Sequence, residues 1–287
     1  MQQEPNQDSS RGKHWLITGV SSGLGRALAD AALRRGDQVT GTVRTEEARS
    51  AIMRGAPERA VVRLLDVTDE ASVRSTIAAT ETETGPIDIV VNNAGYGLVA
   101  GVEEASLAEI RAQFEVNLFG AIAVIQAALP YLRARRAGRI INVSSISGLV
   151  GWPSLGIYSG SKFALEGICE TLAQEVAPLG IHVILIEPGG FRTDFAGRSR
   201  AESECRIDDY AASVGVNRRI LREHAGHEPG DPAKAALAIL RIADVAHPPL
   251  RLMLGADALG YAKRKFEQHA GEIEAWTTLT QSTDFTL

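Results

Sequence analysis

Short runs of aliphatic and β-branched residues recur along most of the chain and alternate with longer segments of helical periodicity. Runs such as IDIVVN, RIINVS and IHVILIE are apolar at successive positions, which is typical of strands buried on both faces of a parallel sheet. The pattern predicts strands over His14–Gly19, Gln38–Val43, Ala60–Leu65, Ile87–Asn92, Arg139–Val143 and His182–Glu187.

The segments between these runs are long enough for crossover helices. Asp69 stands where a helix N-cap belongs, and Gly36 and Gly180 stand where helices end. The alternation of strands and helices predicts an α/β fold, a Rossmann-like doubly wound parallel sheet. The helices are expected over Leu24–Arg35, Asp69–Thr84, Leu107–Ala137 and Gly156–Val176.

The chain shows no internal repeat and no linker before residue 190, which favours a single domain over residues 13–287 after a flexible N-terminal tail at 1–12. Over about 192–230 the composition is charged and irregular, and we interpret this segment as an insertion that closes over the substrate as a lid. A fixed surface loop is the alternative. A helix at Pro232–Ala243 and an edge strand at Leu250–Leu254 are predicted after it.

The overall composition narrows the function classes. The 287 residues are 45% hydrophobic and 23% charged, with a formal net charge of -5 and no basic stripe, so we expect no nucleic-acid partner. Cys169 and Cys205 form neither a disulfide framework nor a zinc spacing, and no metal is expected. The apolar run Gly120–Leu132 is too short to cross a bilayer, and residues 1–13 lack an apolar signal region. We therefore expect a cytoplasmic protein without membrane association.

A glycine-rich turn joins the first predicted strand to the first predicted helix. Gly19 permits a sharp turn, while Gly23 and Gly25 let the backbone and the helix approach a pyrophosphate closely. The helix N-terminus adds unpaired N–H donors. The spacing Gly-x3-Gly-x-Gly differs from the general fingerprint, and such a triad can also be an ordinary loop. Its place at the first strand–helix junction predicts nucleotide binding, with Ser22 and Leu24 in the same contact region.

The end of the second strand indicates which dinucleotide is preferred. NAD sites place an acidic residue about 20 residues beyond the glycines to hold the ribose 2′-hydroxyl. Here Val43 lies 18 residues beyond Gly25, and Arg44 follows it. A guanidinium can bind a 2′-phosphate through two hydrogen bonds, and Ser21 can donate a further one. An ordinary exposed arginine is the alternative, but the pattern favours NADP(H) as the cofactor.

Tyr158 and Lys162 are four residues apart on a predicted helix, which places their side chains on one face, about 5–6 Å apart at Cβ. A free phenol has a pKa of about 10, which is too high for efficient proton transfer at neutral pH. A nearby ammonium lowers that pKa. Ser145, thirteen residues before Tyr158, can hold a substrate oxygen at the same place. An incidental pair on a surface helix is the alternative reading of these residues alone.

Together these features resemble the short-chain dehydrogenase/reductase family in its compact one-domain form. The motifs occur in the family's order and cover residues 13–195, whereas the C-terminal third carries the weakest resemblance. The matching elements are Thr18-Gly19-x3-Gly23-x-Gly25, Asp66-Val67, Asn92-Asn93-Ala94-Gly95, Asn117, Ser145, Tyr158-x3-Lys162 and Pro188-Gly189.

The resemblance implies a role for each matching residue. Tyr158 would be the general acid in carbonyl reduction and the general base in alcohol oxidation, and Lys162 would lower its pKa and hydrogen-bond the nicotinamide ribose. Ser145 would hold the substrate oxygen, and Asn117 would anchor a water that relays protons to Lys162. The other cofactor contacts would come from Asp66 and Val67 at the adenine, from Asn93, Ala94 and Gly95 along the cleft, and from Pro188, Gly189, Phe191 and Thr193 at the nicotinamide end.

Several residues keep more than one interpretation. Asn117 lies in an apolar helix, where its amide can also merely satisfy backbone groups. Glu103, Glu104 and Glu109 are interpreted as the solvated acidic start of that helix. Apolar residues beside the motifs either line a pocket for a moderately apolar ketone, aldehyde or secondary alcohol, or pack in the core or in an oligomer. They are Tyr96, Leu149, Trp152, Leu155 and Phe191.

The residues therefore predict an NADP(H)-dependent oxidoreductase that interconverts a small-molecule carbonyl and an alcohol, acting mainly as a reductase. A catalytically silent NAD(P)-binding sensor on the same fold is the main alternative, although such proteins usually lack the tyrosine or the lysine. A lyase related to halohydrin dehalogenases would carry an arginine in place of Lys162. Family members commonly pair through the two long helices, here near 107–137 and 156–176, so we expect a homodimer or homotetramer.

Overall fold

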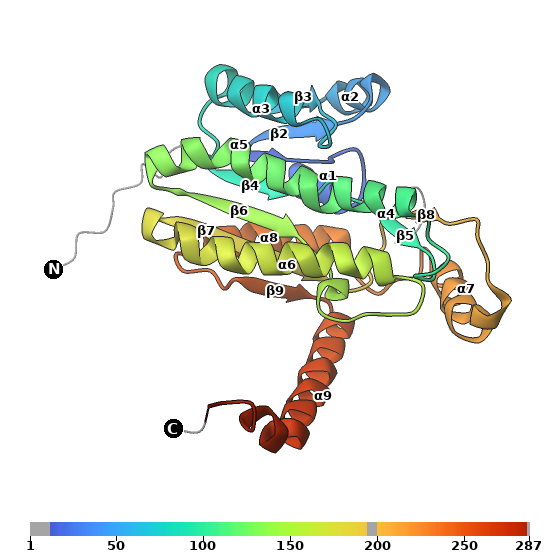
Figure 1. The fold of residues 1–287 in the computed structure, drawn as a ribbon. Helices are drawn as coiled ribbons and strands as arrows, with labels where there is room; N and C mark the ends of the chain where they lie inside the picture. Colours follow the sequence, from blue (N-terminus) through green and yellow to red (C-terminus); the bar gives the residue numbers. More distant parts are fainter. Residues whose placement is uncertain (1–11, 194–199, 286–287) are drawn as a thin grey trace.

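A seven-stranded parallel sheet forms the centre of the molecule (Figure 1). The computed structural model describes residues 12–193 and 200–285, so most of the expected N-terminal tail and part of the expected lid lie outside the described residues. The strand order β3-β2-β1-β4-β6-β7-β9 confirms the predicted Rossmann-like fold. The strands are β1 (His14–Ile17), β2 (Gln38–Val43), β3 (Ala60–Leu64), β4 (Ile89–Asn92), β6 (Gly138–Val143), β7 (Ile181–Pro188) and β9 (Arg251–Leu254).

Helices cover both faces of this sheet (Figure 1). Four of the five predicted helices occur within two residues of their expected starts and ends, and the fifth, α3, passes into a π-helical extension over Thr80–Thr84. Helices α2, α7 and α9 were not predicted. The helices are α1 (Gly23–Arg35), α2 (Glu46–Met53), α3 (Glu70–Ala79), α4 (Leu107–Phe114), α5 (Gly120–Arg135), α6 (Gly156–Val176), α7 (Val216–Glu223), α8 (Pro232–Asp244) and α9 (Ala256–Gln281).

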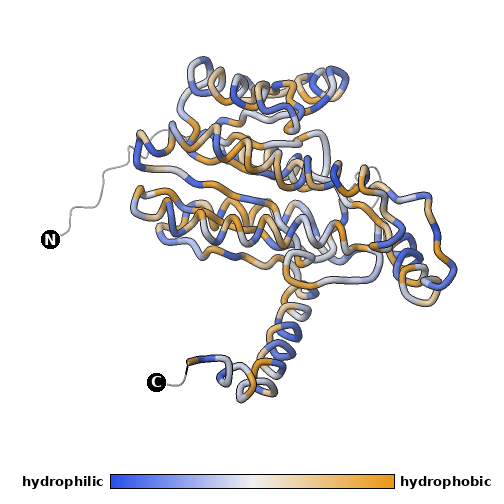
Figure 2. The backbone as a smooth tube through the Cα atoms, viewed as in Figure 1, coloured by the Kyte–Doolittle hydropathy of each residue, from blue (hydrophilic) through white to orange (hydrophobic). Residues whose placement is uncertain are grey.

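Alternate residues of each central strand supply two separate hydrophobic layers. Leu16, Val90 and Ile140 face the layer that α3, α5 and α6 complete, and their neighbours Ile17 and Val91 face the layer that α1 and α8 complete. Both faces of these strands are therefore buried, which is why their sequences are apolar at successive positions. Figure 2 shows the hydrophobic positions gathered along the strands and the helices that cover them.

One helical run in the described part of the chain, Leu107–Arg135, is long and apolar enough to cross a membrane, with a mean hydropathy of 1.4 in its most apolar window. In the structure this run consists of α4, a π-helical turn over Glu115–Phe119, and α5. Its residues Val124, Ile125 and Leu132 are buried against the sheet. In this structure the run therefore packs on the sheet as a core helix.

A second, two-stranded parallel sheet lies beside the carboxyl ends of the main strands. It pairs β5 (Gly97–Val99) with β8 (Arg200–Glu202) and so attaches the segment after residue 199 to the body. From the last strand of the main sheet, α9 leaves the body and projects away from it (Figure 1). The site is built at the edge where the two sheets meet.

Candidate active site

All the predicted site residues that follow strands lie at the carboxyl edge of the main sheet. The glycine turn follows β1, Arg44 follows β2, and the Asn93 turn follows β4. Ser145 lies two residues beyond β6, and Gly189 directly follows β7. Parallel α/β sheets bind ligands at this edge, because the strands end there and the chain can diverge around a ligand.

The glycine turn has the geometry that a pyrophosphate requires. Gly19 and Gly23 have φ values of 72° and 61°, in the left-handed region that favours glycine. A Cβ on Gly25 would lie 2.2 Å from Asn93 Nδ2, so only glycine lets α1 approach the neighbouring turn this closely. Ser22 is the N-cap residue of α1 and makes no side-chain capping bond, which leaves the first N–H groups of the helix available to an anion. These residues fit a dinucleotide phosphate.

Hydrogen bonds fix the glycine turn to the turn after β4. The Thr18 hydroxyl accepts from the backbone N–H groups of Asn93 and Ala94, at 2.9 and 3.0 Å. The Asn93 side chain donates in return to the carbonyl oxygens of Thr18 and Gly19, both at 2.9 Å. The two turns are therefore one rigid unit, which explains why Thr18, Asn93 and Ala94 occur together in the sequence.

The residues predicted at the adenosine end occupy three different environments. Arg44 is exposed and forms no ion pair with a carboxylate of the described residues. Asp66 accepts from the backbone and hydroxyl of Thr68, at 3.0 and 2.8 Å, and so shapes its own turn. Val67 is buried, and a Cβ on Gly120 would lie 2.7 Å from its side chain, so α5 packs tightly on it. Arg44 thus has the side chain that is most available to a ligand.

Tyr158 is buried near the start of α6, and its hydroxyl lies close enough to the side chain of Ser145 for the two to interact. Burial raises the pKa of Tyr158 to about 12, because the phenolate would lose its hydration, and the Ser145 hydroxyl offsets part of that rise. The prediction that Lys162 holds the pKa of Tyr158 below its usual value is therefore wrong for this structure. The desolvation of the phenol is the dominant effect.

Lys162 lies one turn beyond Tyr158 on α6. Its side chain is buried, and Nζ donates to the carbonyl oxygen of Val143 at 2.8 Å. Burial lowers the pKa of Lys162 to about 8, while Glu166 and Cys169 oppose the shift. With a pKa of about 8 the amine still carries its proton for the most part at neutral pH, but the burial of the phenol has the larger effect on the pKa of Tyr158.

Asn117 lies in the π-helical turn between α4 and α5, and its amide is buried. Oδ1 accepts from the backbone N–H of Tyr96 at 3.0 Å, and Nδ2 donates to the carbonyl oxygen of Tyr96 at 2.9 Å. Nδ2 also lies 3.3 Å from the Ser161 hydroxyl on α6. The side chain therefore ties the loop after β4 to the helix that carries Tyr158. Short π-helical turns are frequent at functional sites.

Sequence reasoning missed a buried acidic cluster behind Lys162. Glu166 and Glu187 are both buried there, and the loss of hydration raises the pKa of each carboxyl group. Burial and the neighbouring Glu166 raise the pKa of Glu187 to about 8. Arg251 Nε lies 3.0 Å from Glu166 and 3.3 Å from Glu187. Two features of the sequence could have indicated this cluster. Glu166 lies one helical turn beyond Lys162, and Glu187 ends an otherwise apolar strand.

The interpretation of Glu104 as a solvated residue is wrong. Its side chain is 1% exposed and forms an ion pair at 2.6 Å with Arg218 of α7, which is itself 6% exposed. Glu104 also accepts from the backbone N–H groups of Gly101 and Ile207. Burial opposes ionisation of Glu104, but these hydrogen bonds and Arg218 together lower its pKa. The pair fixes part of the predicted lid segment, residues 200–223, to the body.

The apolar residues beside the motifs lie in different surroundings within the described part of the chain. Trp152 packs edge-on against Tyr261 of α9, with ring centroids 5.4 Å apart, and Leu149 belongs to the same cluster. Phe191 packs against the core layer of α1 and α8 and forms a β-bridge with Gly230. Tyr96 and Leu155 remain half-buried. The first three side chains therefore pack against other elements, and the lining of a substrate pocket stays a prediction.

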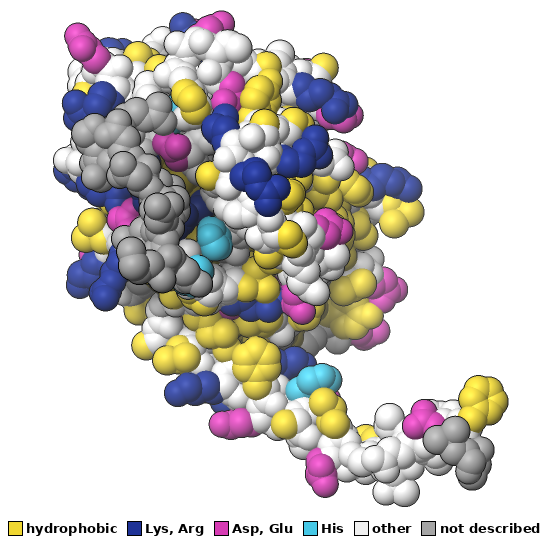
Figure 3. All heavy atoms as spheres, turned by 90° about the vertical axis from the view of Figure 1, so that its left-hand side faces the viewer, with side chains coloured by type: hydrophobic (Ala, Val, Ile, Leu, Met, Phe, Trp, Pro, Cys, Tyr) yellow, Lys and Arg dark blue, Asp and Glu magenta, His cyan; other side chains and the backbone are white. Residues whose placement is uncertain are grey.

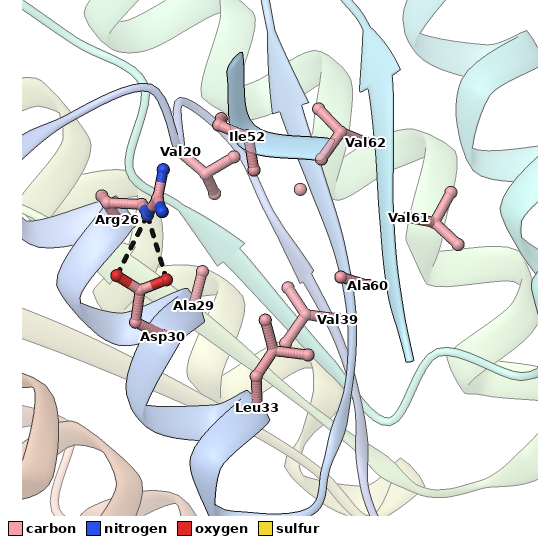
Figure 4. A pocket seen from close by; sticks show the side chains of 11 residues that line it. Val20, Arg26, Ala29, Asp30, Leu33, Val39, Ile52, Ala60, Val61 and Val62 are labelled. Carbon is pink, nitrogen blue, oxygen red and sulfur yellow. Dashed lines mark hydrogen bonds and ion pairs between the residues drawn. The ribbon is translucent and has the colours of Figure 1, made fainter. Parts of the chain in front are cut away.

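Figure 4 shows a separate apolar hollow between α1, α2 and the strands β2 and β3. Val39, Ile52 and Val62 contribute to its walls, and an ion pair between Arg26 and Asp30 lies at its side. None of the predicted catalytic residues lines this hollow. We therefore interpret the hollow as a packing gap beside α1. The candidate active site is the cluster of side chains at the carboxyl edge of the sheet.

Comparisons with known proteins agree with this arrangement. The family model for short chain dehydrogenases matches residues 13–204. Oxidoreductase BOA17 of Botryotinia fuckeliana is 40% identical over 93% of this chain and 98% of its own length. The 3-ketodihydrosphingosine reductase of Bacteroides thetaiotaomicron is 38% identical over 84% of this chain and 87% of its own.

The same relationship appears in solved structures. A short-chain dehydrogenase from Streptomyces avermitilis superimposes with a TM-score of 0.90 at 40% identity, covering 97% of this chain and all of the other. Two more distant structures, at 24% and 26% identity and TM-scores of 0.80 and 0.73, were solved with NAD and with NADP respectively. Fold, motifs and relatives agree that this chain belongs to the short-chain dehydrogenase/reductase family.

Proposed function

We propose that this protein is an NADP(H)-dependent oxidoreductase that interconverts a ketone or aldehyde and the corresponding alcohol. The observation that carries the proposal is the pair of neighbouring hydroxyl groups, Tyr158 and Ser145, at the carboxyl edge of the sheet. Lys162 lies one turn beyond Tyr158 on the same helix. When bound, the nicotinamide dinucleotide supplies or accepts the hydride.

Each side chain of the site has a distinct task in this reaction. Tyr158, which its high pKa keeps protonated at neutral pH, donates its proton to the carbonyl oxygen in reduction and becomes a phenolate. In oxidation the reverse transfer occurs, and the phenolate takes the proton of the alcohol after the tyrosine has passed its own proton to Lys162. Ser145 donates a second hydrogen bond to the same oxygen, where negative charge develops in the transition state. Lys162 can gain or lose a proton near neutral pH and restores the proton of Tyr158. Asn117 positions the loop and the helix around them.

The preference for NADP(H) rests on Arg44. The guanidinium is exposed directly after β2 and forms no ion pair with a described carboxylate, so it is available to a 2′-phosphate. The fold alone does not decide between the two dinucleotides, because related structures bind one or the other. The alternative, a silent NAD(P)-binding sensor, would not need the Tyr158–Ser145 pair.

A screen of carbonyl compounds tests the proposed reaction. The panel contains aliphatic, aromatic and steroid-like carbonyls, and it includes long-chain amino ketones because one relative is named for reducing 3-ketodihydrosphingosine. The proposal predicts substrate-dependent oxidation of NADPH with at least one apolar class. Tight binding of NADPH without turnover across the panel would instead support the sensor.

The proposal also covers the oligomeric state of the protein and its cellular compartment. Phe119 and Phe163 are 52% and 46% exposed on the outer surfaces of the two long helical segments, which supports pairing of two copies there into a homodimer or homotetramer. Cys169 and Cys205 are free thiols, which supports a reducing compartment such as the cytoplasm. Both statements stay predictions.

A further inference from the structure

Helix α9 is anchored to the body only at its first two turns. Ala258 and Ala262 are buried against Ile146, and the Asp257 carboxylate accepts from the backbone N–H of Gly190 at 2.7 Å. Beyond Ala262 no residue of this helix is buried. Figure 1 shows this part of α9 projecting away from the sheet, and from Phe266 to Gln281 it is roughly 22 Å long at the usual helical rise.

Large apolar side chains form one stripe that begins at Leu259 in the anchored turns and continues along the projecting part. Leu259, Phe266, Ile273 and Trp276 are 47%, 54%, 59% and 63% exposed. They are separated by seven, seven and three residues, which is the a and d spacing of a coiled-coil heptad. Ala262 occupies a d position, so the stripe continues the face that the body covers at the start of the helix. Figure 3 shows hydrophobic side chains exposed along this arm.

The charges beside the stripe change sign along the helix. Lys263, Arg264 and Lys265 lie nearer the body, whereas Glu272 and Glu274 lie nearer the end. Lys265 and Glu272 both occupy g positions at the edge of the stripe. In an antiparallel pair of identical helices the g positions face each other, so Lys265 of each copy meets Glu272 of the other. In a parallel pair Lys265 would face Ala270, and no such ion pairs form.

We propose that α9 is a self-association surface, on which a second copy of this chain docks its own α9 in antiparallel orientation through the Phe266, Ile273 and Trp276 stripe. The two-fold arrangement buries the exposed apolar side chains of both copies at once. A membrane surface fits the helix less well, because Glu272 and Glu274 beside the outer stripe would be repelled by anionic lipid headgroups. This surface is separate from Phe119 and Phe163 on the long helices.

Sedimentation velocity of the full chain over a concentration series tests the proposal. Ile273→Asp places a charge in the stripe, and it should halve the apparent mass or raise the dissociation constant at least about tenfold. Leu237→Asp on α8 is the matched control, because Leu237 is an equally large and 60% exposed side chain outside the stripe. That control should sediment like the wild type, and circular dichroism should show equal helix content in both variants.

Charge reversal tests the orientation without touching the apolar stripe. Lys265→Glu and Glu272→Lys should each weaken association, and the double variant should restore it, because the opposite charges then meet again. Additive weakening in the double variant would overturn the antiparallel arrangement. An equal mass for wild type and Ile273→Asp at every concentration would overturn the surface itself. So would binding of a monomeric wild type to phosphatidylcholine–phosphatidylglycerol vesicles that Ile273→Asp abolishes.

Discussion

Lys162 Nζ donates a hydrogen bond to the carbonyl oxygen of Val143 at 2.8 Å. This bond joins α6 to the last residue of β6, two residues before Ser145 and one helical turn beyond Tyr158. The contact therefore sets the separation between the strand end and the helix that carry the two hydroxyl groups. In the proposed mechanism Lys162 has a positioning task in addition to its charge.

Arg44 should determine the choice of dinucleotide. Arg44→Ala removes the proposed 2′-phosphate contact and should lower kcat/KM for NADPH at least about tenfold, or roughly 1.4 kcal/mol, while kcat/KM for NADH changes little. Arg49→Ala on α2 is the control, since Arg49 is 45% exposed and pairs with Glu46. Equal values of kcat/KM for the two cofactors in the wild type would contradict the assignment.

Breaking the buried pair between Arg218 and Glu104 should destabilise the fold. Arg218→Met leaves the Glu104 carboxylate buried without its partner, and we expect a loss of roughly 3–5 kcal/mol in the free energy of unfolding, measured in urea. Arg222→Ala, whose side chain is 57% exposed in the same helix, should cost far less. Removing both charges with Glu104→Gln and Arg218→Met should recover part of the loss.

Glu187 should make stability depend on pH above the acidic range. Its pKa rises from an ordinary value of 4.5 to about 8 on folding, so the folded protein binds more protons than the unfolded chain between these values. Stability should therefore fall as pH rises from about 4.5 to about 8. Glu187→Gln should flatten this fall in urea titrations, whereas Glu170→Gln, at a 53% exposed side chain, should leave its slope as in the wild type.

The pattern of apolar runs was sufficient to predict the sheet, because buried parallel strands carry a strong local signal. The sequence also predicted β9 as an edge strand. It predicted the glycine turn as well, because the backbone conformation of that turn favours glycine. Helix α9 escaped prediction because its exposed stripe is interrupted by His269 and flanked by charges. Only the first two turns of α9 are buried against the body. The sequence therefore gives no apolar partner segment within this chain for the rest of the helix.

The identities of the candidate catalytic residues were predictable, but their energetics were not. The pKa of Tyr158 depends on how deeply the helix is buried, and that depth is set by packing between distant elements. The same is true of Glu104, which pairs with a residue 114 positions later. Sequence spacing suggested an exposed acidic helix start, whereas α7 folds back and covers it.

Tyr158→Phe is the most direct test of the central claim that Tyr158 is the proton donor and acceptor. The substitution removes one hydroxyl and leaves the buried ring in place. With the best carbonyl substrate from the screen, the kcat for NADPH-dependent reduction should fall about 10²–10⁴-fold, which is the usual contribution of a general acid. The NADPH dissociation constant, measured by fluorescence titration of the same variant, should stay close to that of the wild type. Turnover within about tenfold of the wild type, with normal NADPH binding, would contradict the mechanism.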